Sequence, residues 1–188
     1  MRGALVLSLL LCSGAAHAVT PPAKPAPQKA ESQEQLFAQL KQCGSAEDAH
    51  PIEAKLQAMF RASNSPSIEL LMSRAAAAQG SGDAKVARQL VEAVTKIAPN
   101  YAEGWHVRAN MEQGAGDDTA ALVSLQKAVT LNPRQFMALS ELADMLQDYG
   151  DKAGALKLYR RALELDPQLE GAASKVRELT QSVEGRDI

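Results

Sequence analysis

The chain has 188 residues, of which 46% are hydrophobic, 4% aromatic and 22% charged. This composition predicts a domain of helices packed through small and medium side chains, rather than a sheet rich in Val, Ile and aromatic residues. The formal net charge of −2 argues against a nucleic-acid-binding protein, because such proteins concentrate positive charge against phosphates.

Residues 1–18 have the features of a secretory signal peptide. Arg2 supplies the positive charge, residues 4–11 form a short apolar run, and Ala16-His17-Ala18 places small residues where a signal peptidase requires them. The apolar run is too short for a membrane anchor, which needs about 20 residues. We therefore expect cleavage after Ala18 and export, with the periplasm as the expected destination and no stable membrane insertion of the mature chain.

The two cysteines have different expected fates. Bulky Leu11 precedes Cys12, which argues against a lipid-modified cysteine, and cleavage would leave Cys43 as the single thiol. A single cysteine forms no internal disulfide, so the fold must rest on packing. Cys43 is then either buried and inert, or able to link two chains in an oxidising compartment.

Residues 19–30 contain four prolines and predict an extended, solvated linker. Residues 31–66 predict a degenerate helical hairpin that acts as an N-terminal cap over an apolar end. Its first helix is expected over Glu31 to Lys41, and its second is expected to hold Pro51 in its first turn, where the missing N–H costs nothing.

A 34-residue pattern then repeats three times, in residues 68–101, 102–135 and 136–169. Three landmarks recur at this spacing: the prolines Pro99, Pro133 and Pro167, the glycines Gly82, Gly116 and Gly150 that each precede Asp, and the alanines Ala87, Ala121 and Ala155. In each unit we expect two helices joined at the Gly-Asp pair. Glycine permits the positive φ of a tight turn, and Asp caps the next helix.

This pattern resembles the tetratricopeptide repeat family, whose signature is Trp-x2-Leu-Gly-x2-Tyr, then Ala-x3-Phe, then Ala and Pro. The third unit is most similar, with family positions occupied by Leu139, Leu142, Ala143, Leu146, Ala155, Tyr159, Ala162 and Pro167. In the second unit Trp105 stands at the Trp position, followed by Ala109, Ala121, Leu125, Ala128 and Pro133. The resemblance implies an all-α solenoid of antiparallel hairpins, a right-handed superhelix whose small residues let the two helices of each unit approach closely.

Arg74 and Arg108 depart from the family pattern, which has Leu at this position. One interpretation is a pair of anion-binding arginines on adjacent units. The other is that their stems pack between helices while their heads reach a carboxylate or water, with Glu112, one turn after Arg108, as a candidate partner.

After the third unit, residues 169–184 predict a C-terminal capping helix with Ala173, Val176 and Leu179 facing inward. Residues 185–188 are expected to fray.

The sequence has no pattern typical of catalysis or of cofactor or metal binding. His50 and His106 are far apart, no pair of His or Cys has metal-ligand spacing, and no nucleophile stands with a base. The Gly-Asp pairs recur at one phase of the repeat and are therefore turns. We expect a non-catalytic protein with no cofactor.

In the family, the concave wall of the superhelix comes mainly from the first helix of each unit and binds peptides. The resemblance places fifteen residues on this wall: Glu69, Met72, Ser73, Ala76, Gln79, Glu103, His106, Val107, Asn110, Gln113, Met137, Ser140, Glu141, Asp144 and Gln147. The acidic to neutral wall, with apolar patches, suits a basic or mixed-polarity peptide better than an acidic one. The other interpretation is that these residues are solvated helix faces and that the partner binds elsewhere. The resemblance implies a scaffold that binds a protein or peptide, and the signal peptide predicts its export, with envelope complex assembly as a candidate role. The alternatives are a self-associating structural module and a chaperone-like carrier for an exported peptide.

Overall fold

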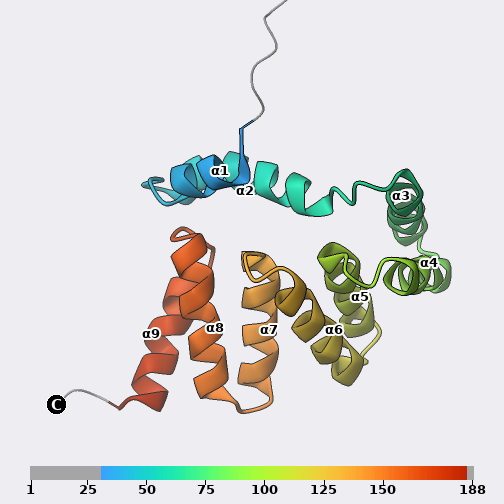
Figure 1. Ribbon diagram of the computed structural model, residues 1–188. Coiled ribbons are helices and arrows are strands. Elements are labelled where there is room, and N and C mark those ends of the chain that lie inside the picture. Colours follow the sequence, from blue (N-terminus) through green and yellow to red (C-terminus); the bar gives the residue numbers. More distant parts are fainter. Residues whose placement is uncertain (1–30, 186–188) are drawn as a thin grey trace, which may run out of the picture. The chain divides into compact units, whose positions relative to one another are not determined.

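The structure is a computed structural model that describes residues 31–185. Within them it contains helices and no strands, which confirms the all-α solenoid (Figure 1). The helices are α1 Gln33–Leu40, α2 Ala46–Arg61, α3 Pro66–Gly80, α4 Ala84–Ile97, α5 Ala102–Gly114, α6 Asp118–Leu131, α7 Phe136–Asp148, α8 Lys152–Leu165 and α9 Ala172–Val183. The predicted signal peptide (1–18), the linker (19–30) and residues 186–188 of the predicted frayed tail lie outside the described residues.

Each of the three 34-residue units contains an antiparallel pair of helices: α3–α4, α5–α6 and α7–α8. The Gly-Asp turns between them share one geometry. Gly82, Gly116 and Gly150 have φ values of 83°, 77° and 86°. The Asp that follows each glycine accepts a hydrogen bond from the backbone three residues later, at 3.2, 3.1 and 2.9 Å. The turn chemistry predicted from the sequence is thus confirmed.

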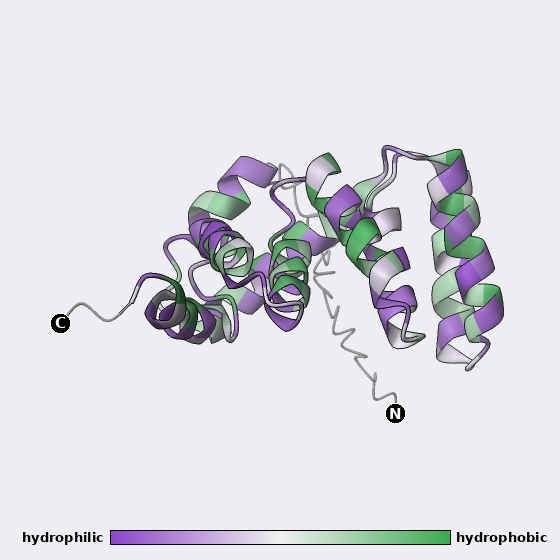
Figure 2. Cartoon of the chain, turned by 90° about the horizontal axis from the view of Figure 1, so that it is seen from below, coloured by the Kyte–Doolittle hydropathy of each residue, from purple (hydrophilic) through white to green (hydrophobic). Residues whose placement is uncertain are grey.

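Small residues lie where the two helices of a unit cross. Ala87, Ala121 and Ala155 are completely buried, and Ala109 and Ala143 on the partner helices are at most 1% exposed. Figure 2 shows apolar residues in green and polar residues in purple interspersed along the helices. Of the described helices, none is long and apolar enough to cross a bilayer.

In the N-terminal hairpin α1–α2, the second helix begins earlier than predicted. α2 begins at Ala46 rather than near Pro51, because the Ser45 side chain accepts from the Asp48 backbone N–H and caps the helix there. Pro51 therefore lies inside α2, where it leaves the Glu47 carbonyl without its helical donor.

The position of this hairpin is the main departure from a simple stack. Its apolar residues share a core with the third unit and α9, not with the first unit. Phe37 and Phe60 lie with their ring centroids 6.5 and 6.4 Å from that of Phe136, the first residue of α7. Figure 1 shows α1 and α2 lying across the ends of α7, α8 and α9. The hairpin thus covers the helix ends of the third unit, although it is adjacent in sequence to α3.

Polar contacts fix the hairpin in this place. Arg134, in the loop before α7, pairs with Glu34 and lies 4.1 Å above the Phe37 ring. Gln168, after α8, donates to the Cys43 carbonyl oxygen at 3.0 Å. The half-buried Cys43 thiol donates to the Gln39 carbonyl, and burial raises the pKa of this thiol.

The C-terminal helix α9 packs on α8 and begins at Ala172, three residues after Leu169. Gly171, directly before it, has a φ of 74°, and this left-handed conformation sets the point at which the helix begins. As a result Ala172 is buried and Ala173 is exposed, so the prediction that Ala173 faces inward is wrong. Leu179 is buried as expected.

Candidate functional site

The residues predicted for one continuous concave wall fall into separate environments. The α3 residues and part of α5 line an open groove. Residues near the start of α5 and α7 face the C-terminal half of α2. Residues near the end of α7 contact α8 and α9. The placement of α2 and α9 therefore divides the predicted wall.

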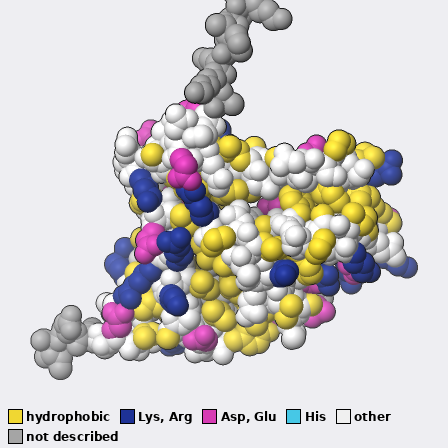
Figure 3. All heavy atoms as spheres, viewed as in Figure 1, with side chains coloured by type: hydrophobic (Ala, Val, Ile, Leu, Met, Phe, Trp, Pro, Cys, Tyr) yellow, Lys and Arg dark blue, Asp and Glu magenta, His cyan; other side chains and the backbone are white. Residues whose placement is uncertain are grey.

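The open groove lies between α3 and α5 and has a volume of about 660 Å³. Five of the predicted residues from α3 line it, together with two from α5. The lining residues are Glu69, Met72, Ser73, Ala76, Gln79, Gly80, Glu103, Val107 and Met111, with Arg61 and Tyr101. Met72, Ala76, Val107 and Met111 make its surface largely apolar. Figure 3 shows hydrophobic side chains gathered below the C-terminal end of α2, where α3 and α5 lie.

Arg61, Tyr101 and Met111 line this groove although the sequence did not predict them. The Tyr101 hydroxyl donates to the Arg61 carbonyl oxygen at 2.6 Å, which joins the end of α2 to the loop before α5. Burial raises the pKa of Tyr101 to about 12, so this hydroxyl stays protonated. Tyr101 follows Pro99 by two residues, and this position at the start of a repeat was the signal in the sequence that could have pointed to it. Arg61 reaches the groove only because α2 ends there, which the sequence did not indicate.

His106 lies at the centre of a polar cluster between α5 and α7, beside α2. Its Nε2 is 2.8 Å from Glu141 Oε2, and its Nδ1 is 3.5 Å from Glu103 Oε2. The Gln135 amide donates to Glu103 at 2.6 Å, and its nitrogen lies 2.9 Å from His106 Nδ1. Phe60 and Arg61 of α2 border the same site, together with Gln57, Asn110 and Met137.

The charge of His106 is set by its two carboxylate neighbours. Burial alone would lower the pKa of His106, but the hydrogen bonds to Glu103 and Glu141 outweigh burial and raise it to about 9. The contact of Gln135 with Nδ1 would suit a neutral ring. The two carboxylates prevail because a neutral ring would leave both negative charges uncompensated. The ring is thus protonated at neutral pH, and the Gln135 amide then donates to Glu103 only.

The predicted wall residues at the end of α7 are engaged within the protein. Asp144 accepts a hydrogen bond from the Tyr159 hydroxyl, and it lies 3.8 Å from Lys175 Nζ of α9. Gln147 accepts from Lys175 at 3.4 Å. Gln113 lines a separate small hollow between the ends of α5 and α7, with Met145. These residues do not join the open groove.

Arg108 packs as a structural residue. Its guanidinium lies 5.3 Å from the centre of the Trp105 ring, and its Nε donates to Glu112 at 2.7 Å. Glu112 is buried and also accepts from the Ser124 hydroxyl at 2.6 Å. The predicted pairing of Arg108 with Glu112 is confirmed, whereas Arg74 lies exposed on α3. The two arginines therefore do not form an equivalent pair.

The described residues, 31–185, hold no group of three or more His, Cys, Asp or Glu side chains that could bind a metal ion. The ionisable groups that line the open groove are Arg61, Glu69, Tyr101 and Glu103. What the groove offers a ligand is an apolar floor with charged groups at its edge.

Comparisons with known proteins agree with this architecture. A family model of the tetratricopeptide repeat matches residues 136–169, the third unit. The comparison with curated protein sequences found no match.

Several solved structures share the fold. The first tetratricopeptide repeat domain of Spaghetti (RPAP3), bound to an HSP90 peptide, superposes with a TM-score of 0.56 at 20% identity, covering 62% of this chain and 93% of that one. The Yersinia enterocolitica type III secretion chaperone SycD, in complex with a peptide of the translocator YopD, gives 0.56 at 18% identity, covering 63% and 95%. A Thermobaculum terrenum O-GlcNAc transferase gives 0.54 at 27% identity, but the match spans 64% of this chain and only 23% of the transferase. The third unit is thus a tetratricopeptide repeat, and residues 31–185 share the helical-repeat fold of these structures.

Proposed function

We propose that the protein is a non-catalytic, exported scaffold that binds a protein or peptide partner in the open groove between α3 and α5. The observation that carries this proposal is the groove itself. It is the part of the predicted concave wall that neither α2 nor α9 covers, and its volume of about 660 Å³ is in the range of ligand-binding pockets.

The proposed ligand is an extended or helical segment with apolar anchors and basic or mixed polar residues. Met72 and Met111 give the floor adaptable apolar surface, since methionine side chains adjust to different partners. Glu69 and Arg61 also line the groove, whereas the Glu103 carboxylate is only 11% exposed and is paired with His106. One free carboxylate with one guanidinium suits a basic or mixed segment that pairs with Glu69.

Two neighbours in fold support the peptide class. Spaghetti (RPAP3) is bound to an HSP90 peptide, and SycD is bound to a peptide of a translocator. The proposed export rests on the signal-peptide features of residues 1–18. Export would place the protein in the periplasm, where we propose a role in envelope complex assembly.

The test is capture of cross-linked partners from the envelope fraction of the source cells, using wild type beside Glu69→Lys/Met72→Ser. Both positions line the groove from α3. Glu178→Lys, on the exposed side of α9, is the matched charge control. We expect the groove variant to lose the partner and the control to keep it.

Glu141 and Asp144 are unsuitable for this experiment. Glu141 holds His106, and Asp144 accepts from Tyr159, so their substitution would disturb packing as well as any binding surface. Equal recovery by wild type and by the folded Glu69→Lys/Met72→Ser variant would refute the groove. A precursor that is never cleaved after Ala18 would refute export.

A further inference from the structure

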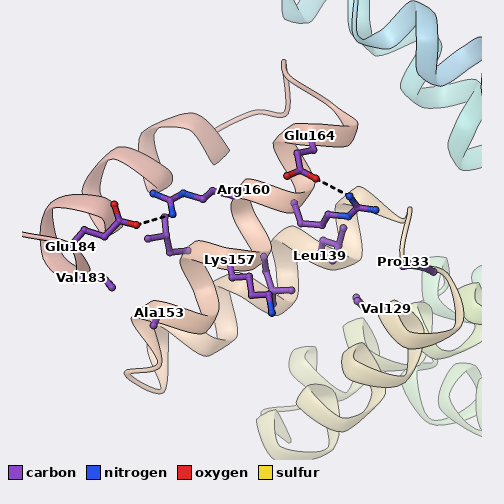
Figure 4. A pocket seen from close by; sticks show the side chains of 12 residues that line it. Val129, Pro133, Leu139, Ala153, Lys157, Arg160, Glu164, Val183 and Glu184 are labelled. Atoms are coloured by element: carbon purple, nitrogen blue, oxygen red, sulfur yellow. Dashed lines mark hydrogen bonds and ion pairs between the residues drawn. The ribbon is translucent and has the colours of Figure 1, made fainter.

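A second groove runs along α8, on a surface that includes none of the predicted wall residues. It has a volume of about 710 Å³ and is bounded by the end of α6, the start of α7 and the end of α9. Figure 4 shows Val129 and Pro133 at one border, Ala153 and Lys157 along α8, and Val183 with Glu184 at the other border. We call it the α8 groove. It shares no residue with the groove between α3 and α5.

The repeat pattern accounts for only part of the α8 groove. Its wall along α8 comes from positions spaced by three and four residues, so it is one stripe of that helix. Buried Leu139 and Leu156 form its apolar floor, and Val183 at the rim is 41% exposed. The apolar surface that solvent reaches in the groove comes from Val129 and Leu158, which are half-buried, and from Val183.

The charged rim has a definite sign. Lys157, Arg160 and Arg161 line the groove against two carboxylates, Glu164 and Glu184. Arg160 pairs with Glu184 and Arg161 with Glu164, each at 2.8 Å, and their side chains remain 47% and 50% exposed. Within residues 31–185 no carboxylate forms an ion pair with Lys157. Figure 3 shows basic side chains gathered on the side of the molecule where α8 and α9 lie.

We propose that the α8 groove docks an acidic amphipathic segment of a partner protein. Its aliphatic or aromatic side chains cover Val129 and Val183, and its carboxylates pair with Lys157 and with the exposed sides of Arg160 and Arg161. The excess of basic over acidic side chains on the rim selects acidic segments, whereas the groove between α3 and α5 selects basic or mixed ones. The protein thus has two docking surfaces of opposite charge preference.

The rim argues against two other anionic partners. An anionic membrane is recognised by clusters of about four to eight Lys or Arg, and this rim has three, two of them already paired. A nucleic acid would similarly require several unpaired cations aligned with phosphates, and it would make little use of an apolar floor.

The experiment uses the full mature chain and three probes. One is a labelled helical peptide with Leu on one face and Glu on the other. The second has the same Leu positions with Lys in place of Glu. The third is a vesicle of phosphatidylglycerol. Binding is measured by fluorescence anisotropy for the peptides and by co-sedimentation for the vesicles, and amide chemical shifts locate the site.

We expect the Leu/Glu peptide to bind more tightly than the Leu/Lys peptide, with shifts confined to the ends of α6 and α9 and to α8. Lys157→Glu/Arg161→Glu should weaken this binding by about tenfold or more, and added salt should weaken it in wild type. Lys85→Glu/Lys96→Glu makes the same charge change on exposed positions of α4 and should leave binding unchanged. Lys157→Gln alone, a milder change, should weaken binding in the same direction if the double variant fails to fold.

Four results would overturn the proposal: no binding of the Leu/Glu peptide, equal binding of both peptides, shifts in α3 and α5 instead of α8, or binding to vesicles alone. Dilution of the protein without a probe gives a further check. Concentration-dependent shifts at α8 would show that a second copy of the chain occupies the groove, which also overturns the proposal. None of these readouts depends on the partner of the groove between α3 and α5.

Discussion

The first and third repeats have the same backbone plan but very different cores. In the third repeat, α7 buries Phe136, Leu139 and Leu142, and the N-terminal hairpin and α9 cover the unit. In the first, α3 buries only Ile68 and Ala75, and Leu70 is 53% exposed. The repeat fixes how two helices pair, whereas the size of the side chains outside the pairing surface decides what else covers them.

The difference explains where the N-terminal hairpin packs. Its aromatic residues, Phe37 and Phe60, find a third ring in Phe136, and ring pairs of this kind add stability beyond the area they bury. α3 presents the run Ala75 to Ala78, which has little surface to cover. The hairpin therefore seals the third repeat and leaves the concave side of the first repeat open as a groove.

Phe136→Ala should produce the largest effect, because it removes the ring that both hairpin aromatics contact. We expect the free energy of unfolding to fall by about 3–5 kcal/mol in urea denaturation. Leu70→Ala, on exposed surface of the first repeat, should change it by less than about 0.5 kcal/mol. Similar losses in the two variants would contradict the view that the hairpin depends on the third repeat.

Ala155→Leu tests the close approach of helices inside the third repeat. Ala155 is completely buried between α7 and α8, and the added atoms must displace its neighbours. We expect a loss of about 1–3 kcal/mol by overpacking. Ala77→Leu, on an exposed face of α3, is the matched control and should melt like wild type. An Ala155→Leu protein that also melts like wild type would show that the helices do not depend on a small residue here.

What the sequence predicted well is what depends on neighbours along the chain. The Gly-Asp turns and the buried alanines follow from a period of 34 residues and from backbone chemistry that acts within a few residues. The start of α2 was misplaced because the cap at Ser45 competed with the signal from Pro51. Both are local effects, and the stronger capping interaction prevailed.

What the sequence did not predict depends on contacts between distant segments. Nothing in the pattern of residues 31–66 indicates that Phe37 packs against Phe136 rather than against α3. That contact places α2 beside α5 and α7, and so it decides that Met72 and Val107 line an open groove while His106 joins a partly buried cluster. The structure therefore distributes the residues of the predicted wall over several separate hollows, and their role in binding stays a prediction.

Glu53 provides a pH-dependent test of the hairpin's attachment. Burial, then the nearby Asp166 carboxyl, raises the pKa of Glu53 from 4.5 to about 7, and burial also raises the pKa of Asp166. His50 and Glu170 are the other charged groups that act on Glu53. The folded state therefore retains a proton that the unfolded state loses above about pH 4.5, and stability should fall as the pH rises from there through about 7.

Glu53→Gln should remove this dependence, because the amide carries no charge at either pH. We expect the variant to melt at a higher temperature than wild type at pH 8 and to lose the advantage at pH 5. Glu47→Gln changes an exposed carboxylate near the start of the same helix and should preserve the wild-type pH profile. A Glu53→Gln protein whose melting temperature still falls between pH 5 and 8, as in wild type, would place the titrating group elsewhere.

The smallest effect should come from the helix caps. We expect the two repeats to lose the same stability and to differ in how many helices exchange faster. Asp83 caps α4 and Asp151 caps α8 through the same hydrogen bond, at 3.2 and 2.9 Å. Replacement of either by Ala should cost about 1 kcal/mol.

In hydrogen exchange, Asp83→Ala should speed exchange mainly in α4, because the first repeat is thinly covered and can open by itself. Asp151→Ala should speed exchange across α7, α8 and the N-terminal hairpin together, since these share one core. If each variant speeds exchange only in its own helix, the N-terminal hairpin and the third repeat do not open as one unit. The two repeats would then differ only in how much of their surface is exposed.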